Sequence, residues 1–486
     1  MFKEYSDERA RLRADTLGAG RKRGTRSRIA RRRRVARLGR CTRRVLVGYD
    51  SAVINGAVTA IGLQFKASPG ALGLTVSSAL VGAAAGALVA GRIADGYGRL
   101  AAMRLAAVLF VVSAIGSGLA NSLVVLALFR IIGGVAVGMA SVIAPAYIAE
   151  IAPAGIRGRL GSLQQLAIVS GIFLSLLVDY AIAAAAGNSR TVWAAGLEAW
   201  RWMFIAMTFP ALVYGVLSLT IPESPRHLLA KGRIDEARKV LQRVLGERGL
   251  TAKISQIRDS LSRDKEPSWL DLRGPAMGLL PIVWVGIGLS VFQQFVGINV
   301  IFYYSSVLWQ AVGFSEKNSL IITVITSVVN VVTTLVAISL IDRWGRRPLL
   351  LVGSAGMAVT LGILAVIFGQ APLDAQGQPH LQGSAGPIAL LAANVYVFAF
   401  GMSWGPVVWV LLGEKFPNHI RAAALSVAAS AQWIANWAIS TSFPVLKNAG
   451  LGLAYGLYAT FAVLSFFFVW RFVQESKGRE LEDMSG

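Results

Sequence analysis

Long apolar stretches alternate with short polar connections along almost the whole chain. Each stretch is about 20 residues or longer, the length that an α-helix needs to cross a bilayer. Twelve such segments can be drawn, and we predict spans at 45–66, 71–94, 100–120, 122–146, 160–186, 200–221, 276–311, 319–341, 348–370, 386–413, 421–446 and 451–473. The pattern therefore predicts an all-α membrane protein with twelve transmembrane helices.

The polar connections carry their basic residues on one side of these spans, which is also the side of both termini. The positive-inside rule predicts that this side is the cytoplasm. The residues are Arg92, Arg99, Arg104, Arg157, Arg159, the block from Arg226 to Arg273, Arg343, Arg346, Arg347 and Arg421.

One connection is much longer than the others, and it divides the spans six and six. Its apolar residues recur at helical spacing among charged ones, so we predict short amphipathic helices on the inner face of the membrane. The predicted organisation is an Arg-rich tail at 1–44, six-helix bundles at 45–221 and 275–473, a linker at 222–274, and a cytoplasmic tail at 474–486.

The two halves repeat each other. Three pairs of motifs recur in the same order at a similar offset, which chance rarely produces, and this predicts two parallel six-helix repeats suited to alternating access. The pairs are Asp95-Gly96-Tyr97-Gly98-Arg99 with Asp342-Arg343-Trp344-Gly345-Arg346, Glu150 and Arg157 with Glu414 and Arg421, and, more weakly, Pro222-Glu223-Ser224-Pro225-Arg226 with Gln474-Glu475-Ser476-Lys477-Gly478.

Composition narrows the function. The chain is 55% apolar and 15% charged with a mean hydropathy of +0.59, too hydrophobic for a soluble protein of 486 residues. The single cysteine, Cys41, allows no internal disulfide, and three scattered histidines form no metal-binding pattern. Because no phosphate-binding loop or nucleophile elbow is present, we expect neither an enzyme nor a cofactor.

The run from Phe292 to Tyr304 places three amide side chains, Gln293, Gln294 and Asn299, in a lipid-compatible segment. An unpaired amide in hydrocarbon costs a few kcal/mol, so these groups either bond neighbouring helices or face a polar cavity. A straight helix would point them in different directions, whereas a break at Gly297 would turn all three toward one point. From this run alone both interpretations stay open.

Together with motifs elsewhere, this run resembles the sugar porter family of the major facilitator superfamily. The resemblance covers about Gly48 to Met484 and is nearest to the bacterial proton-coupled pentose and hexose symporters. Its motifs are Gly48-Tyr49-Asp50, Arg130-Ile131-Ile132-Gly133-Gly134, Pro222-Glu223-Ser224-Pro225-Arg226, the run from Gln293 to Asn299, Trp404-Gly405-Pro406 and Gln432-Trp433. It implies the major facilitator fold.

The resemblance also implies which residues line a sugar pocket. Amides donate and accept hydrogen bonds, and an indole offers a flat apolar face, which together suit a neutral polyhydroxylated ring. The implied residues are Gln165, Gln293, Gln294, Asn299, Asn330, Trp409, Gln432 and Trp433. Tyr303 and Tyr304, just beyond Asn299, are expected to close the outer side, and aromatic packing is the alternative explanation for them. Taken singly, Gln165, Asn330 and Gln432 are explained as well by hydrogen bonds between helices.

Asp50 and Arg130 are the charged residues drawn furthest into the spans of the first half. Ionisable residues inside the membrane are energetically costly, so we interpret this acid and base as functional and expect them to pair. Family members that couple transport to protons carry an acid here, so the resemblance implies proton symport. The alternative is a purely structural ion pair.

The loop motifs predict a cytoplasmic gate formed by charge networks between the repeats. Exposed ion pairs contribute about 0–1 kcal/mol each, so a gate needs networks rather than single pairs. The expected pairs are Asp95 with Arg99, Glu150 with Arg157, Asp342 with Arg346, Glu414 with Arg421, and Glu223 with Arg226.

Some positions depart from the family pattern. Gly96, Leu100 and Ala422 replace residues usual in the loop motifs, and Asp179 near the outer end of its span has no assigned role. Only a few apolar residues separate Asp50 from an Arg-rich segment. Either the first span begins late, or residues 1–44 form a tail that binds anionic lipid or nucleic acid, or they come from a shifted reading frame, which we favour over the nucleic-acid role.

We therefore expect a monomeric, multi-pass protein of the bacterial inner membrane with both termini in the cytoplasm. The predicted function is import of a neutral monosaccharide, such as glucose, galactose or xylose, by proton symport, with no nucleic-acid partner. A facilitative uniporter of the same fold is one alternative, and a non-transporting sugar sensor is another.

Overall fold

In the computed structural model, residues 45–151, 154–245, 250–263, 272–372, 381–416 and 420–475 are described. Their regular structure is helical throughout. The first span is Val45–Gln64, and its second part is α2 (Ile54–Gln64). The other helices of the first half are α3 (Pro69–Tyr97), α4 (Arg99–Gly118), α5 (Leu123–Ile151), α6 (Ala154–Ala186), α7 (Ala199–Ala206) and α8 (Thr208–Thr220). Those of the second half are α12 (Pro281–Phe295), α13 (Ile298–Ala311), α14 (Glu316–Trp344), α15 (Arg346–Gly369), α16 (Ala385–Met402), α17 (Trp404–Lys415), α18 (Arg421–Ala449) and α19 (Leu451–Phe472).

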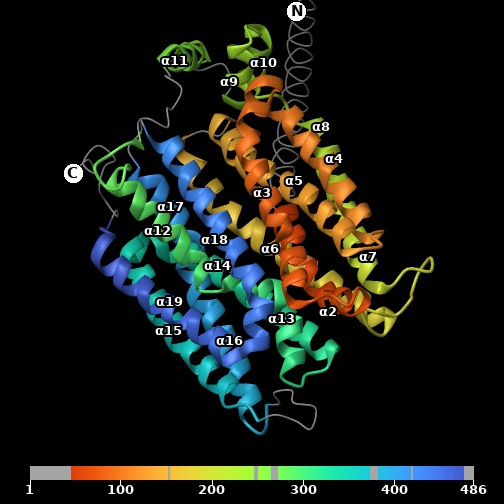
Figure 1. The fold of residues 1–486 in the computed structure, drawn as a ribbon. Coiled ribbons are helices and arrows are strands. Elements are labelled where there is room, and N and C mark those ends of the chain that lie inside the picture. The colour runs from red at the N-terminus through yellow and green to blue at the C-terminus, as the bar shows by residue number, and fades with distance from the viewer. Residues whose placement is uncertain are drawn as a thin grey trace, which may run out of the picture.

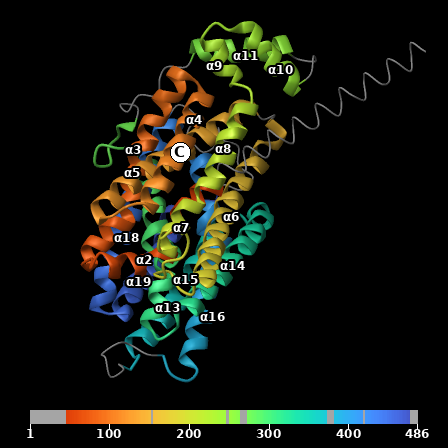
Figure 2. The same cartoon turned by 90° about the vertical axis from the view of Figure 1, so that its right-hand side faces the viewer.

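The two halves form two helical bundles side by side (Figure 1). Helix α3 packs against α18, α6 against α14, and α2 against α13, so each bundle contributes to one long interface. Three short helices between the halves, α9 (Pro225–Ala230), α10 (Ile234–Leu245) and α11 (Leu250–Arg263), cap one end of the molecule in both views (Figures 1 and 2). We call this the linker end and the opposite one the far end.

Eleven helical segments in the described part of the chain are long and apolar enough to cross a membrane. They correspond to eleven of the twelve predicted spans. The twelfth, predicted at 421–446, is α18, which has 29 residues but is less apolar because Gln432, Asn436 and several serines interrupt its apolar residues. The prediction of a multi-span, all-helical fold is confirmed.

Several spans are broken near their middle. The span Pro281–Ala311 breaks at Gly297, a possibility that the sequence left open, and further interruptions at Val53, Met207 and Ser403 divide the spans Val45–Gln64, Ala199–Thr220 and Ala385–Lys415. Irregular backbone at such depth, as at Gly297 and Ser403, is tolerated only where protein or a cavity covers it.

The linker helices have a small apolar core of their own. Leu228 and Leu229 of α9 pack with Ala237 and Val240 of α10, and Ile254 and Ile257 of α11 cover them. The predicted amphipathic helices are therefore present, and part of the apolar face of α10 is turned toward its neighbouring helices.

Candidate functional site

Asp50 and Arg130 lie together inside the first half. The Asp50 side chain is 2% exposed and that of Arg130 is 3% exposed. Arg130 donates from Nη1 to the backbone carbonyl of Asp50 at 3.0 Å, and the same nitrogen lies 3.8 Å from Asp50 Oδ1. Arg130 thus forms a hydrogen bond with the backbone of Asp50 and only a longer ion pair with the Asp50 carboxylate.

This pair faces a narrow pocket between the two halves. The pocket is lined by Asp50 and Ser51 from the first span, Arg130 from α5, Tyr303 from α13 and Trp433 from α18, together with apolar residues of α3 and α5. Two charged residues of the first half and two aromatic residues of the second half therefore share one cavity.

The backbone at Gly297 explains how two of the three amides of the broken span, those of Gln294 and Asn299, meet, whereas Gln293 turns to another helix. Gly297 has a φ of +85°, a left-handed conformation that favours glycine, and it separates α12 from α13. Across the break the Asn299 amide donates to Gln294 Oε1. The backbone carbonyl of Val296, at the break, accepts a hydrogen bond from the Tyr396 hydroxyl at 2.7 Å, so a neighbouring helix satisfies this polar group.

Gln293 is only partly satisfied. Its amide nitrogen donates to the backbone carbonyl of Trp404 at 2.8 Å, next to the second break, while its Oε1 is buried without a described hydrogen-bond partner. A buried acceptor left in this state is available to a ligand or a water molecule.

The remaining predicted sugar residues lie on four helices. Gln165 is on α6, Asn330 on α14, Trp409 on α17 and Gln432 on α18. Their side chains form no hydrogen bond within the described part of the chain, so the helix-to-helix bonds considered as an alternative for the three amides are not seen there. Trp409 is 39% exposed, more open than the other residues of this set.

Two tyrosines follow the amides on α13. Tyr304 donates to the carbonyl of Ser440 at 2.9 Å, which fixes it against α18. The Tyr303 hydroxyl accepts a longer contact of 3.5 Å from Asn436, a buried residue of α18 that the sequence analysis did not select. Asn436 interrupts an apolar helix face, and this sequence feature could have identified it as a candidate.

Asn55 is a second residue that the sequence analysis missed. Its amide donates to the carbonyl of Phe302 at 3.1 Å, its Oδ1 accepts from the backbone of Ser306, and its carbonyl accepts from the Ser306 hydroxyl. Ser77 and Thr441 add a 2.6 Å hydroxyl contact between α3 and α18. These bonds join the two halves on the side of the molecule away from the linker helices.

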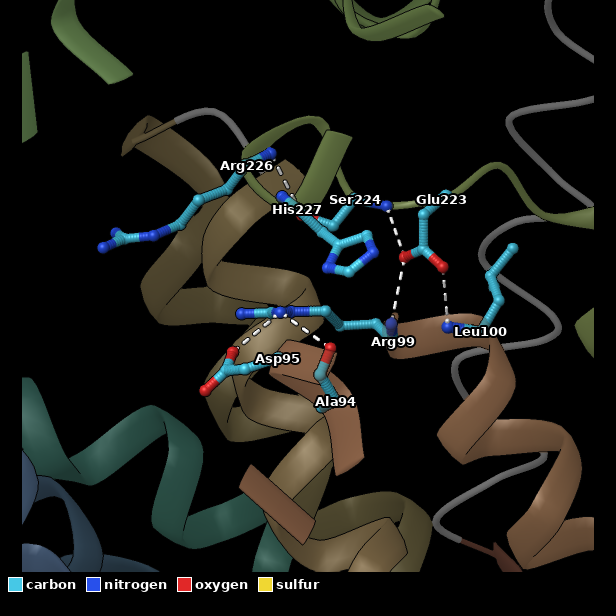
Figure 3. A network of polar contacts seen from close by, with 8 residues as sticks. All are labelled: Ala94, Asp95, Arg99, Leu100, Glu223, Ser224, Arg226 and His227. Carbon is cyan, nitrogen blue, oxygen red and sulfur yellow. Dashed lines mark hydrogen bonds and ion pairs between the residues drawn. The ribbon is translucent and has the colours of Figure 1, made fainter. Parts of the chain in front are cut away.

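At the linker end, a carboxylate caps a helix in the first half (Figure 3). Glu223 accepts the backbone N–H groups of Arg99 and Leu100, both at 3.1 Å, at the start of α4. Gly98 precedes them with a φ of +101°, and a side chain there would come within 2.5 Å of the carboxylate. Arg99 also forms a 2.8 Å ion pair with Asp95.

The second half repeats this arrangement closely. Glu475 accepts the backbone N–H groups of Arg346 and Arg347 at 3.0 and 2.9 Å, directly after Gly345 with its φ of +94°. Arg346 forms a two-bond ion pair with Glu414. A carboxylate at a helix N-terminus satisfies unpaired N–H groups and complements the helix dipole.

Some expected gate contacts differ from the structure. Glu223 does not pair with Arg226, because its oxygens accept backbone N–H groups of Arg99, Leu100 and Ser224 instead. The contacts just described run within each half rather than between the repeats. The side chains of Glu150, Arg157, Asp342 and Arg421 lie outside the described part of the structure, as do residues 1–44.

His227 lies beside the first cap, where Figure 3 shows its ring next to Arg99. The side chain is 7% exposed. Burial lowers the pKa of His227 below its usual value, against the opposing effect of Glu223 and with a further lowering by Arg99 and Lys231. The neutral imidazole is therefore the form that fits this site.

Comparison with known proteins identifies the family. The family model described as "Sugar (and other) transporter" matches residues 38–486. This chain belongs to the sugar transporter family. The family consists of transporters, which agrees with the prediction that the chain is not an enzyme.

Sugar transporters from bacteria are similar over most of their length. A glucose transport protein of Synechocystis is 58% identical over 441 residues, covering 90% of this chain and 94% of the relative. The D-xylose-proton symporter of Escherichia coli K12 is 38% identical, with 90% and 92% covered. The inward-open structure of the E. coli xylose transporter XylE aligns with a TM-score of 0.77 at 36% identity, covering 92% and 98% of the two chains. The protein is thus a multi-pass sugar transporter of the major facilitator fold.

Proposed function

We propose that this sugar transporter imports a neutral monosaccharide by proton symport, through alternating access between its two halves. The observation that carries the proposal is the pocket that Asp50 and Arg130 share with Tyr303 and Trp433. Trp433 is the expected sugar residue that lines this pocket, so a sugar stacked on its ring would lie close enough to the charged pair for the two sites to influence each other. Relatives named as D-xylose-proton and arabinose-proton symporters support the same interpretation.

The proton step follows from the geometry of the charged pair. Ionised Asp50 attracts Arg130, which also holds the backbone carbonyl of Asp50. Protonation of the carboxylate removes this attraction, so the first span and α5 become free to shift relative to each other. Release of the proton on the cytoplasmic side restores the pair.

The sugar step uses groups of the second half. Gln293, Asn330 and Gln432 retain hydrogen-bonding capacity, and the Trp433 ring borders the pocket. A neutral sugar ring suits such amides and an indole face, and the described lining contains Arg130 as a cation, already engaged by Asp50. We infer a neutral monosaccharide on these grounds.

Orientation and gating complete the proposal. We assign the linker end and both termini to the cytoplasm of a bacterial cell, from the positive-inside rule. The far end then faces outward, closed by the bonds of Asn55 to Phe302 and Ser306. Glu223 and Glu475, the carboxylates that cap α4 and α15, hold the polar networks at the linker end that open and close the cytoplasmic side.

The test is uptake by purified protein in liposomes with an imposed pH gradient. Labelled glucose, galactose, xylose and inositol are offered singly and in competition, with and without a protonophore. We expect accumulation of one sugar above its external concentration, abolished by the protonophore. Equal entry with and without the protonophore would instead support the facilitative uniporter, and no entry of any sugar would support the sensor.

A further inference from the structure

Asp179 is a fully buried carboxyl group that the proposed transport cycle does not use. It lies on α6, in the part of the helix toward the far end, and its side chain is 0% exposed. Neither carboxyl oxygen forms a hydrogen bond of normal geometry with a described residue, although the backbone N–H of Gly56 lies close enough to act as a weak donor. Asp179 forms no ion pair with a described residue either, which sets it apart from Asp50.

The surroundings of Asp179 hold further unsatisfied polar groups. The Tyr49 hydroxyl lies within electrostatic reach of the carboxyl, and the Ser175 hydroxyl lies one helical turn before it on the same face of α6. Both hydroxyls are buried without a described partner. Among the described residues, Tyr49 is the titratable group that faces Asp179, and Met203 of α7 supplies an apolar contact nearby.

Such a site accepts the neutral form of a carboxyl group. An ionised carboxylate buried without a cation or hydrogen-bond donors is strongly destabilised, whereas the protonated acid needs only a modest polar environment. Native proteins rarely leave several buried polar groups unsatisfied at one place without a functional reason. In this conformation the site therefore favours the protonated form of Asp179.

The position of Asp179 links this proton to closure of the far end. The carboxyl packs on Gly56 of α2, so closely that a side chain at Gly56 would come within 2.8 Å of Asp179 Cβ. Gly56 follows Asn55, which holds α13 by three hydrogen bonds. When α2 leaves α13, a shift of α2 relative to α6 changes its contact with Asp179, and water can then reach the carboxyl.

We propose that Asp179 is a second proton-binding site, which takes a proton from the outside when the far end is open and must be protonated for the far end to close. The step is simple proton binding: hydronium gives its proton to the carboxylate, and water leaves. The outward direction rests on the proposed orientation. The proposal does not require proton coupling at Asp50 and holds equally for a uniporter.

Opening of the far end can be measured without transport. Spin labels are attached at Lys66→Cys after α2 and Lys317→Cys in α14, both exposed at the far end, in a Cys41→Ser background. The distance distribution is recorded by electron resonance in liposomes across a pH series. We expect the open population to rise with pH, because ionised Asp179 prevents closure. In Asp179→Asn, which resembles the protonated acid, this response should be lost and the far end should stay closed.

Asp235→Asn is the control for loss of a carboxylate, since this exposed residue of α10 has no part in the proposed transport cycle. It should leave the pH-dependent opening in place, and an unchanged pH response in Asp179→Asn would overturn the proposal. If Asp179→Asn does not fold, Asp179→Glu keeps an acid there, and its opening midpoint must move; an unmoved midpoint would also overturn the proposal.

Infrared spectroscopy gives an independent readout. The wild type at neutral pH should show the carbonyl stretch of a protonated carboxyl that is missing in Asp179→Asn. Absence of such a difference, in folded protein, would mean that Asp179 is ionised and would overturn the proposal. Sugar accumulation enters neither measurement, so failure of proton symport would be recognised separately.

Discussion

The two halves share an architecture but differ in the chemistry that they bury. Among the described residues, the buried charged side chains inside the spans, Asp50, Arg130, Asp179 and Arg201, all belong to the first half. The buried polar side chains of the second half are amides and hydroxyls. At the linker end, by contrast, Glu223 and Glu475 cap matching helices in nearly the same way.

This difference suggests a division of labour within a duplicated fold. Charge can respond to protons, and neutral amides can bind a sugar without competing for protons. The capping sites, which serve both halves alike, have kept their geometry. Substitutions in matched positions can test whether proton and sugar functions are separable.

The largest expected effect is from Asp50→Asn. The variant cannot bind and release the proton, so sugar accumulation against a gradient should fall to the equilibrium level. Exchange of internal for external sugar should continue, because the amides of the second half are unchanged. Accumulation and exchange are measured in the same liposomes, and persistent protonophore-sensitive accumulation in the variant would remove Asp50 from the coupling step.

The converse variant is Gln293→Ala in the second half. Losing an amide that bonds the sugar should cost about 1–3 kcal/mol of binding free energy, or roughly a 5- to 150-fold weaker affinity. Equilibrium binding of labelled sugar measures this. Gln310→Ala, on the same span toward the far end, is the control and should bind normally.

Coupling should survive in the Gln293→Ala variant. At saturating sugar the variant should still accumulate sugar under a pH gradient. If accumulation is lost together with affinity, proton coupling and sugar binding are not assigned to separate halves as proposed.

A smaller effect is expected where the halves are alike. Removal of the capping carboxylate in Glu223→Ala or in Glu475→Ala exposes two helix N–H groups, and each should destabilise the protein by about 0.5–2 kcal/mol. The two variants should lower the thermal unfolding midpoint by similar amounts. Glu236→Ala, an exposed residue paired with Arg233, is the control and should have little effect. Clearly unequal losses would show that the repeated geometry is not energetically equivalent.

The smallest effect should come from His227, beside the cap of the first half. Its pKa is lowered in the folded protein, so the unfolded chain binds the proton more readily. The stabilising contribution of neutral His227 is therefore complete above its ordinary pKa of about 6.5, and it is lost as the pH falls through the lowered folded value. Wild type should lose stability relative to His227→Gln on acidification, as thermal unfolding across this range can detect.

Much of the fold could be predicted from the sequence because the bilayer sets helix length and polarity. The break at Gly297 was predictable from a glycine beside amides. The breaks at Met207 and Ser403 were not predicted, although Pro210 follows the first and Gly405 and Pro406 follow the second, because membrane helices also accommodate glycine and proline without a break. The division into domains at 45–221, 222–274 and 275–473 stays a prediction.

The site was predictable where residue chemistry alone singles out a position, as for Asp50 and Arg130. Asn55 was missed because its partner Ser306 is 251 residues away, and no local pattern indicates which helices meet. Glu223 was paired with Arg226 in error, since the sequence displays side-chain charges but not the backbone N–H groups that the carboxylate accepts. The roles of the sugar and gate residues stay predictions.

The reduced apolarity of α18 has a consequence for biosynthesis. A helix with Gln432 and Asn436 near its middle gains less from leaving the insertion machinery for lipid than the other spans do. It finds its polar partners on α13, and it packs against α3 of the first half and α12 of the second. The helices α3, α12 and α13 are synthesised before α18 and are therefore already in the membrane when α18 emerges. We expect α18 to insert by packing against them, so that its insertion and the assembly of the two halves occur together.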